Sequence, residues 1–161
     1  SAHLTSFSLF DAQLPIFNED SESKDVKSSG VKSLREAFKS HDCFFIASPE
    51  YNGSLSAALK NAIDWGSRQH GTERILECFE GKSVFLLSAS PGNLGGARVL
   101  PHLRVIMAQL KTHVFCEQVN VARAHEVFNN NGKWNDQQQR DALKKTTLKA
   151  IQFANMLRLE R

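Results

Sequence analysis

The sequence predicts an α/β domain in which a parallel sheet is covered by helices on both faces. Strand-like and helix-like segments alternate along the 161 residues, and such alternation is typical of a parallel sheet with helical crossovers. The continuous apolar run Cys43–Ala47 and the segment Lys82–Ser88, with its apolar centre Val84–Leu87, have the length and composition of strands buried on both faces. No internal repeat or second domain is evident, so residues 1–161 are expected to form a single domain.

Each predicted element follows from a local pattern of apolar and polar residues. Apolar residues of Val31–Lys39 share one helical face, and this helix is expected to begin as early as Ser23. Pro101 is compatible only with the first turn of its helix, and Asp136 is expected to cap a closing helix that ends near Leu157. In chain order, the prediction is a strand at His3–Phe10, a connection at Asp11–Gly30, a helix at Val31–Lys39, a strand at Cys43–Ala47, a loop at Ser48–Ser54, a helix at Leu55–Ser67, a connection at Arg68–Gly81, a strand at Lys82–Ser88, a loop at Ala89–Gly96, a helix at Ala97–Leu110, a strand at Thr112–Val121 and the closing helix.

Composition and charge argue against several classes of protein. The net charge of +3 comes from scattered cations and not from a basic stripe, so no nucleic-acid partner is expected. The apolar runs are far too short to cross a bilayer and no secretion signal is visible, so no membrane association is expected. The three cysteines are far apart and form no CxxC pair, which fits a reducing compartment and predicts a cytoplasmic protein. The histidines lack metal-binding spacing, so no metal site is expected.

The segment Ser48–Ser54 is the first candidate ligand loop, because it follows a buried strand and opens a helix. Gly53 permits a positive φ or a close backbone approach, Tyr51 offers an aromatic face, and Asn52 offers donors and acceptors. Such a loop can hold a flat heteroaromatic ring through backbone amides and stacking. The alternative is an ordinary strand-to-helix turn in which proline and glycine only shape the backbone.

The segment Ser88–Gly96 is the second candidate loop. Its three glycines and two serines precede a helix and leave backbone N–H groups uncovered, which suits the carbonyl or anionic edge of a ligand. It is not a phosphate loop of the Walker type, because no Gly-Lys-Ser follows; the alternative is a flexible surface loop. Ligands of open parallel sheets bind at the carboxyl ends of the strands, so we expect both loops at one edge, where a single planar ligand contacts both.

The residues of these loops resemble the signature of a known family. The run Pro49–Ser54, followed by Leu59–Trp65 and Ser67–Arg68, is similar to the motif of NADPH-dependent FMN reductases, which include quinone, chromate and azo-dye reductases. The run Ser90–Arg98 resembles the second flavin loop of that family, and Leu14–Asn18 resembles its Pro-containing segment after the second strand. The resemblance extends over nearly the whole chain.

The resemblance implies a flavodoxin-like, doubly wound sheet in three α/β/α layers, with strand order 2-1-3-4-5. It implies FMN as cofactor, NAD(P)H as electron donor, and a quinone, free flavin, azo compound or metal oxyanion as the small-molecule acceptor. No catalytic side chain is required and none is nominated. Family members form dimers or tetramers through helices that correspond to Leu55–Arg68 and Ala97–Leu110. The residues implied to contact the flavin ring are Pro49, Glu50, Tyr51, Asn52 and Gly53 in the first loop and Ser90, Pro91, Gly92, Asn93, Leu94 and Gly95 in the second.

The phosphate-binding part of the family has no counterpart in the sequence. In the family, the first strand ends in a Gly-Ser-x-Arg-type loop that cradles the FMN phosphate at a helix N-terminus, whereas His3–Phe10 resembles the second strand. Without the first strand, two neighbouring strands would stand about 9–10 Å apart, twice the normal spacing. Three explanations are open: the sequence omits residues before Ser1, the chain is a fragment or alternative product, or His3–Phe10 shifts inward to pair with Asp42–Ala47. The domain is therefore expected to be N-terminally incomplete relative to the family, and this form is expected to bind FMN poorly.

Three functions are compatible with the sequence. The leading hypothesis is an FMN-dependent NAD(P)H oxidoreductase. An electron carrier on the same fold is disfavoured by the net charge of +3, because flavodoxin-type carriers tend to be strongly acidic. A non-catalytic or truncated paralogue that acts as an oligomeric binding module stays open, because the phosphate loop is missing.

Overall fold

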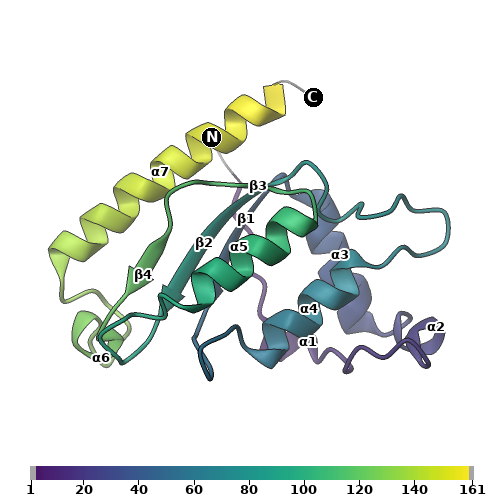
Figure 1. Ribbon diagram of the computed structural model, residues 1–161, viewed down its shortest axis with the longest axis horizontal. Coiled ribbons are helices and arrows are strands. Elements are labelled where there is room, and N and C mark those ends of the chain that lie inside the picture. The colour runs from purple at the N-terminus through teal and green to yellow at the C-terminus, as the bar shows by residue number, and fades with distance from the viewer. Residues whose placement is uncertain (1–2, 160–161) are drawn as a thin grey trace.

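The two apolar runs of the sequence lie side by side in a parallel sheet (Figure 1). The computed structural model describes residues 3–159. Its elements, in chain order, are α1 (Leu9–Ala12), α2 (Glu22–Asp25), α3 (Ser29–Ser40), β1 (Cys43–Ser48), α4 (Ala57–Ser67), β2 (Ser83–Ala89), α5 (Val99–Gln109), β3 (His113–Val114), β4 (Val119–Val121), α6 (Ala124–Val127) and α7 (Gln137–Leu159).

Strand β2 is the centre of the sheet. It pairs with β1 in parallel from Cys43 opposite Ser83 to Ser48 opposite Ser88. On its other side it pairs in parallel first with β3 and then with β4. The single strand predicted at Thr112–Val121 is therefore wrong in detail, because residues 115–118 leave the ladder between β3 and β4.

Alternate residues of β2 contact two different helical layers. Val84 and Leu86 pack with apolar residues of α4 and α5 in the largest cluster of the core. Phe85 lies on the opposite face, with Phe115 and Ala150 of α7. Helices therefore cover both faces of the sheet, as the sequence predicted and as Figure 1 shows for α5 and α7. This is the open α/β/α arrangement of a flavodoxin-like fold.

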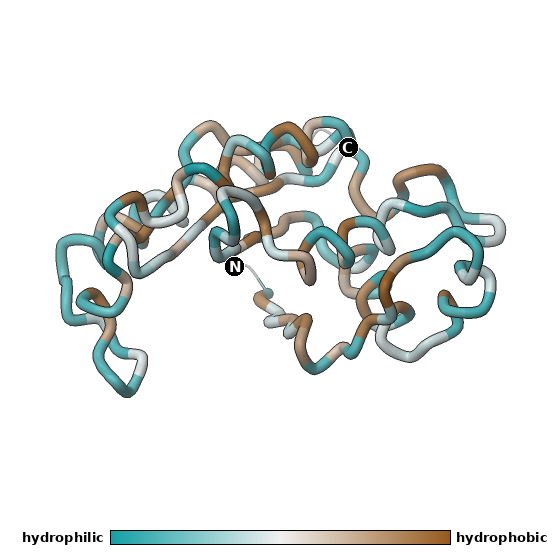
Figure 2. The backbone as a smooth tube through the Cα atoms, turned by 60° about the horizontal axis from the view of Figure 1, so that its bottom comes forward, coloured by the Kyte–Doolittle hydropathy of each residue, from teal (hydrophilic) through white to brown (hydrophobic). Residues whose placement is uncertain are grey.

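The segment His3–Phe10 is not a strand, contrary to the prediction from its sequence. Residues 3–8 pair with no strand, and α1 begins at Leu9, where the Ser8 hydroxyl accepts the Asp11 N–H at 3.2 Å. The segment is rich in apolar residues, which appear as brown stretches in Figure 2. Its side chains Phe7 and Leu9 pack against the cluster formed by α3 and α4. Packing against helices therefore replaces strand pairing, and the inward shift of this segment onto β1, one of the three open explanations, does not occur.

The outer half of the sheet is covered on one face only. Strand β1 pairs with no strand other than β2 among residues 3–159. On the face that α7 covers above β2, Phe45 of β1 is 37% exposed and Ala47 is exposed as well. Helix α7 packs against β2 and β4. An open edge and an uncovered apolar face therefore coincide at β1.

The boundary between α2 and α3 has a steric cause. The sequence predicted that the helix around Val31 could begin as early as Ser23, but α3 begins at Ser29. The Ser28 hydroxyl caps it by accepting the Val31 N–H at 3.4 Å. Gly30 lies so close to α1 that a Cβ atom there would be 1.9 Å from the Ala12 carbonyl oxygen. The approach of α1 thus requires glycine at the first turn of α3.

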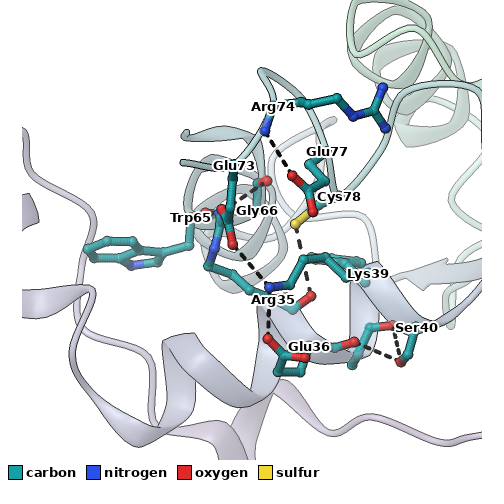
Figure 3. A network of polar contacts seen from close by, with 12 residues as sticks. Arg35, Glu36, Lys39, Ser40, Trp65, Gly66, Glu73, Arg74, Glu77 and Cys78 are labelled. Carbon is teal, nitrogen blue, oxygen red and sulfur yellow. Dashed lines mark hydrogen bonds and ion pairs between the residues drawn. The ribbon is translucent and has the colours of Figure 1, made fainter. Parts of the chain in front are cut away.

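A charged network fastens α3 to α4 and to the connection that follows α4 (Figure 3). Arg35 is buried and donates to the Trp65 carbonyl oxygen at 2.8 Å, and it forms an ion pair with Glu73. Lys39 donates to Glu73 at 3.0 Å. Burial alone would raise the pKa of Glu73, but the hydrogen bonds from Lys39 and Arg35 outweigh it, and the pKa lies below its usual value. The network holds the C-terminal end of α4 in place.

Candidate functional site

The first predicted loop forms a tight turn at the carboxyl end of β1. Tyr51 and Ser54 exchange two backbone hydrogen bonds of 2.9 and 3.0 Å. The two residues between them, Asn52 and Gly53, have φ angles of +51° and +78°, which is the pattern of a type I′ turn. The Tyr51 ring is 61% exposed. The loop therefore presents an aromatic face and backbone groups at the edge of the sheet.

Helix α4 follows this turn and also holds the Pro-containing segment that precedes it in the chain. The Ser56 hydroxyl caps α4 by accepting the Leu59 N–H at 3.3 Å. Asn61 accepts the Phe17 N–H at 2.8 Å, and the Trp65 indole N–H donates to the Pro15 carbonyl oxygen at 2.8 Å. Trp65 has no exposed surface, so it belongs to the core and is not available for stacking on a ligand.

The second predicted loop is tied down through its carbonyl groups. The Ser88 hydroxyl donates to the Gly95 carbonyl oxygen at 2.8 Å, and the Asn120 amide donates to that of Leu94 at 3.1 Å. The Arg123 N–H donates to the Gly92 carbonyl oxygen at 3.1 Å. These bonds fix the loop against β2, β4 and the segment after β4, and they leave the N–H groups of Gly92, Asn93 and Leu94 for other partners.

Two glycines allow the second loop to lie this close to its neighbours. A Cβ atom on Gly95 would be 2.6 Å from the Ala122 nitrogen. A Cβ atom on Gly96 would be 2.9 Å from that of Ser88 and 3.6 Å from that of Glu50, and Gly96 also has a φ of +78°. Both positions therefore need glycine, for space and for backbone conformation.

The two loops meet at one edge of the sheet. The Glu50 carboxylate accepts the Arg98 backbone N–H at 3.0 Å and its Nε–H at 2.9 Å. Ser54 and His102 of α5 form a second link, with the hydroxyl oxygen 2.9 Å from Nδ1. The predicted proximity of the loops is confirmed. The family resemblance assigned Glu50 to the flavin, but the Glu50 carboxylate forms this connection to Arg98.

Unpaired backbone N–H groups are the feature of this edge that a ligand can bind. Within residues 3–159, no hydrogen bond is donated by the N–H groups of Glu50, Asn52, Gly53, Gly92, Asn93 and Leu94. They come from both loops and can bind the ring nitrogens and carbonyl oxygens of a planar heterocycle. The residues of the edge therefore fit the ring of a flavin.

A phosphate group fits this edge less well than a ring does. Anions bind at helix N-termini whose N–H groups are free, and α4 and α5 both begin here. The Ser56 hydroxyl already caps α4, and the negatively charged Glu50 carboxylate accepts the Arg98 N–H at the start of α5. Neither of these two termini is suited to the phosphate of FMN.

Four residues that were not nominated as ligand contacts orient the two loops through the bonds described above: Ser88, Arg98, Asn120 and Arg123. Ser88 and Arg98 lie within the predicted runs, whereas Asn120 and Arg123 were not predicted as part of the edge. The opposite charges of Glu50 and Arg98 were a visible signal, since both residues belong to the runs that resemble the family. Arg123 has a φ of +44°, which local sequence does not indicate.

Other kinds of site are not formed by the described residues. A hollow of about 420 Å³ lies between α6 and the start of α7 and is lined in part by Arg123, Glu126 and Asp136, but none of the predicted loop residues lines it. No cluster of potential metal ligands occurs within residues 3–159. None of the helices in that part of the chain has both the length and the apolar character needed to cross a membrane.

Comparison with known proteins places the chain in a family. The family model described as NADPH-dependent FMN reductase matches residues 1–126. A probable NADPH:quinone oxidoreductase 2 of Oryza sativa subsp. japonica is 35% identical over 150 residues, which is 91% of this chain and 70% of the relative. An NAD(P)H-dependent FMN reductase of Pseudomonas aeruginosa is 34% identical over 141 residues, which is 87% of this chain and 72% of the relative.

A solved structure shares both the fold and part of the sequence. The flavoenzyme FerB, an NAD(P)H:(acceptor) oxidoreductase from Paracoccus denitrificans, superposes with a TM-score of 0.66 at 25% identity. The match covers 92% of this chain and 75% of that one. The chain therefore belongs to the NADPH-dependent FMN reductase family of oxidoreductases, with FMN as cofactor and NAD(P)H as electron donor.

Proposed function

We propose that this protein transfers a hydride from NAD(P)H to FMN and then electrons to a quinone. The observation that carries the proposal is the row of unpaired N–H groups that two adjoining loops present at one sheet edge. The names of the rice relative and of FerB, a quinone oxidoreductase and an acceptor oxidoreductase, support a small-molecule acceptor. Free flavin, azo compounds and metal oxyanions are further acceptors of the same type of reaction.

The role of the chain in this reaction is to bind and orient. We assign the flavin ring to residues 49–53 and 90–95, where the unpaired N–H groups meet its polar edge. The chemistry supplied by bound FMN is hydride acceptance and electron delivery. Both are direct transfers between stacked rings, so no side-chain acid or base is assigned. Tyr51, with its exposed ring, offers a stacking surface beside the acceptor.

The assembly that we propose is a homodimer or homotetramer formed through α4 and α5. Val105 of α5 is 70% exposed, and an apolar side chain on a helix beside the site is suited to an interface. The free cysteines Cys43, Cys78 and Cys116 agree with a reducing, cytoplasmic compartment.

A steady-state assay tests the proposed reaction. The purified chain is mixed with NADPH and a benzoquinone, with and without added FMN, and NADPH oxidation is followed by absorbance. We expect oxidation that depends on all three components. A protein that binds FMN and is inert toward NADPH would refute the proposal in favour of an electron carrier.

Two glycine variants make that assay specific to the second loop. Gly95→Ala places a Cβ atom 2.6 Å from the Ala122 nitrogen, so it displaces the loop and is expected to abolish FMN-dependent turnover. Gly132→Ala is the matched control, since Gly132 also has a positive φ but has open space around it. Equal activities of the two variants would contradict the assignment of residues 90–95 to the flavin.

A non-catalytic binding module is the second candidate function. It is favoured by the observation that neither α4 nor α5 offers a free N-terminus to a phosphate. Under this alternative the chain releases FMN during gel filtration and fails to oxidise NADPH even when FMN is added in excess. Retention of flavin absorbance with the protein peak would exclude weak binding.

A further inference from the structure

We propose that Glu50 and Arg98 act as positioning residues that hold the two flavin loops in register, and that the Glu50 carboxylate does not contact the flavin. The inference deepens the proposed function, because it concerns the same edge of the sheet. We use the name loop clamp for the four residues Glu50, Ser54, Arg98 and His102. It consists of two links between the first loop and α5, the helix that begins directly after the second loop.

The Glu50 carboxylate is fully engaged. One oxygen accepts the Arg98 backbone N–H and the other accepts its Nε–H, and the Glu50 side chain is only 10% exposed. An exposed surface ion pair contributes little, but this pair includes a backbone donor and a nearly buried carboxylate, so its charge-assisted hydrogen bonds are stronger. A carboxylate that is bonded through both oxygens and is so little exposed offers little acceptor surface to a ligand.

Glu50 also takes over the task of a helix cap. Arg98 is the N-cap residue of α5, and its own side chain makes no capping hydrogen bond. The carboxylate of Glu50, from the neighbouring loop, accepts the N–H at this position instead. A negative charge at a helix N-terminus is favourable. The start of α5, and with it the end of the second loop, is thus located by the first loop.

The link between Ser54 and His102 fixes the other end of the same turn. Arg98 and His102 are four residues apart and therefore lie one above the other on the helix. Glu50 directly precedes the Tyr51–Ser54 turn and Ser54 ends it, so the turn is held at both ends by one helix. The unpaired N–H groups of Asn52 and Gly53 are thereby kept at a constant position relative to those of residues 92–94.

This arrangement matters for a ligand that spans both loops. A ring that bonds to both sets of N–H groups gains the full benefit only if their separation is already set before binding. Loss of the loop clamp leaves each loop intact but lets the two loops move relative to each other. The expected consequences are weaker binding and a less fixed orientation of the bound ring.

Riboflavin is the probe that isolates the ring site, because it carries the flavin ring without the phosphate. Binding is measured by fluorescence quenching for the wild type, Glu50→Gln, Arg98→Gln and the double variant. Each single change is expected to weaken binding about 10-fold, the size of one lost charge-assisted hydrogen bond. The double variant is expected to be no weaker than either single variant, since the two residues act through one link.

Glu80→Gln is the matched control. Glu80 pairs with Lys111 at 2.9 Å in a link that joins the connection after α4 to the end of α5, away from the loops. It undergoes the same chemical change as Glu50→Gln and should leave riboflavin binding unaltered. If Glu50→Gln weakens binding no more than Glu80→Gln does, the clamp has no role in positioning.

A spectroscopic readout separates positioning from stability. At saturating riboflavin, the induced circular dichroism of the visible flavin band reports how firmly the ring is oriented. We expect a reduced band in both single variants and an unchanged band in Glu80→Gln. A purely stabilising role of Glu50 and Arg98 would leave the saturated band intact, and that result would overturn the proposal.

If the wild type binds no riboflavin, that result counts against the proposed function alone. A measurement without ligand then still tests the role of Glu50 and Arg98. The N–H groups of Tyr51 and Ser54 are hydrogen-bonded within the turn. Their hydrogen exchange should be about 10-fold faster in Glu50→Gln than in Glu80→Gln, in proportion to the interaction lost. Equal exchange rates would show that the clamp does not hold the turn.

Discussion

Replacement of Gly96 by alanine tests how closely the two loops must approach each other. Gly96 has a φ of +78°, and a Cβ atom there would be 2.9 Å from the Ser88 Cβ and 3.1 Å from its hydroxyl oxygen. Ser88 is buried and bonded to Gly95, so it has little freedom to move aside. The substitution therefore imposes a backbone penalty and a steric penalty together.

Gly53 separates these two penalties. It has the same φ of +78°, but an added Cβ atom would meet nothing within 4 Å. Gly53→Ala is expected to lower the free energy of unfolding by about 1 kcal/mol, the penalty of a left-handed conformation for a residue with a side chain. Gly96→Ala adds overpacking, which contributes about 1–3 kcal/mol more. The difference between the two variants thus measures the steric term alone.

Urea unfolding followed by circular dichroism gives both free energies. We expect Gly96→Ala to be less stable than Gly53→Ala by about 1–3 kcal/mol. A difference below about 0.5 kcal/mol lies within the scatter of surface substitutions. It would mean that the second loop shifts to accommodate the added Cβ atom without a steric penalty. In that event the close packing of the loops would not be a constraint on the site.

Three further predictions concern the parts of the fold that support the site. The pKa of Glu73 lies below its usual value of 4.5, so its stabilising contribution is present above that pH and is lost as the pH falls through the lower folded value; the free energy of unfolding of Glu73→Gln should therefore depend less on pH below 4.5 than that of the wild type. Ser56→Ala removes the hydroxyl that accepts the Leu59 N–H and should lower the free energy of unfolding by about 1 kcal/mol, whereas Ser56→Thr should retain most of it. Val105→Lys introduces a charge on the exposed face of α5, which should reduce the self-association seen by sedimentation; association that persists unchanged would locate the contact elsewhere.

The ring and the phosphate of FMN set two different conditions for binding. The ring site is formed by residues 49–53 and 90–95, whose separation depends on the Glu50–Arg98 pair. The phosphate of FMN would require a free helix N-terminus, which α4 and α5 do not provide. Comparing riboflavin with FMN therefore separates the two conditions, because only FMN carries the group that the described residues do not fit.

The sequence by itself determined the elements whose signals are local. The runs Cys43–Ala47 and Lys82–Ser88 became neighbouring parallel strands, because continuous apolar runs between polar loops have few other stable arrangements. The cap at Asp136 was also predictable, and its carboxylate accepts the Gln139 N–H at 2.9 Å at the start of α7. The loops after both strands followed from their glycine and proline content together with the family resemblance.

Tertiary structure alone decided the features that depend on partners distant in sequence. The apolar segment His3–Phe10 has a strand-like composition, yet Phe7 and Leu9 pack on α3 and α4 and residues 3–8 pair with no strand. The pairing of Glu50 with Arg98 joins residues 48 positions apart, and no local pattern specifies such a distance. A sequence pattern sets which face of an element is apolar, whereas the partner of that face, or of a buried carboxylate, is chosen by the packing of the whole chain.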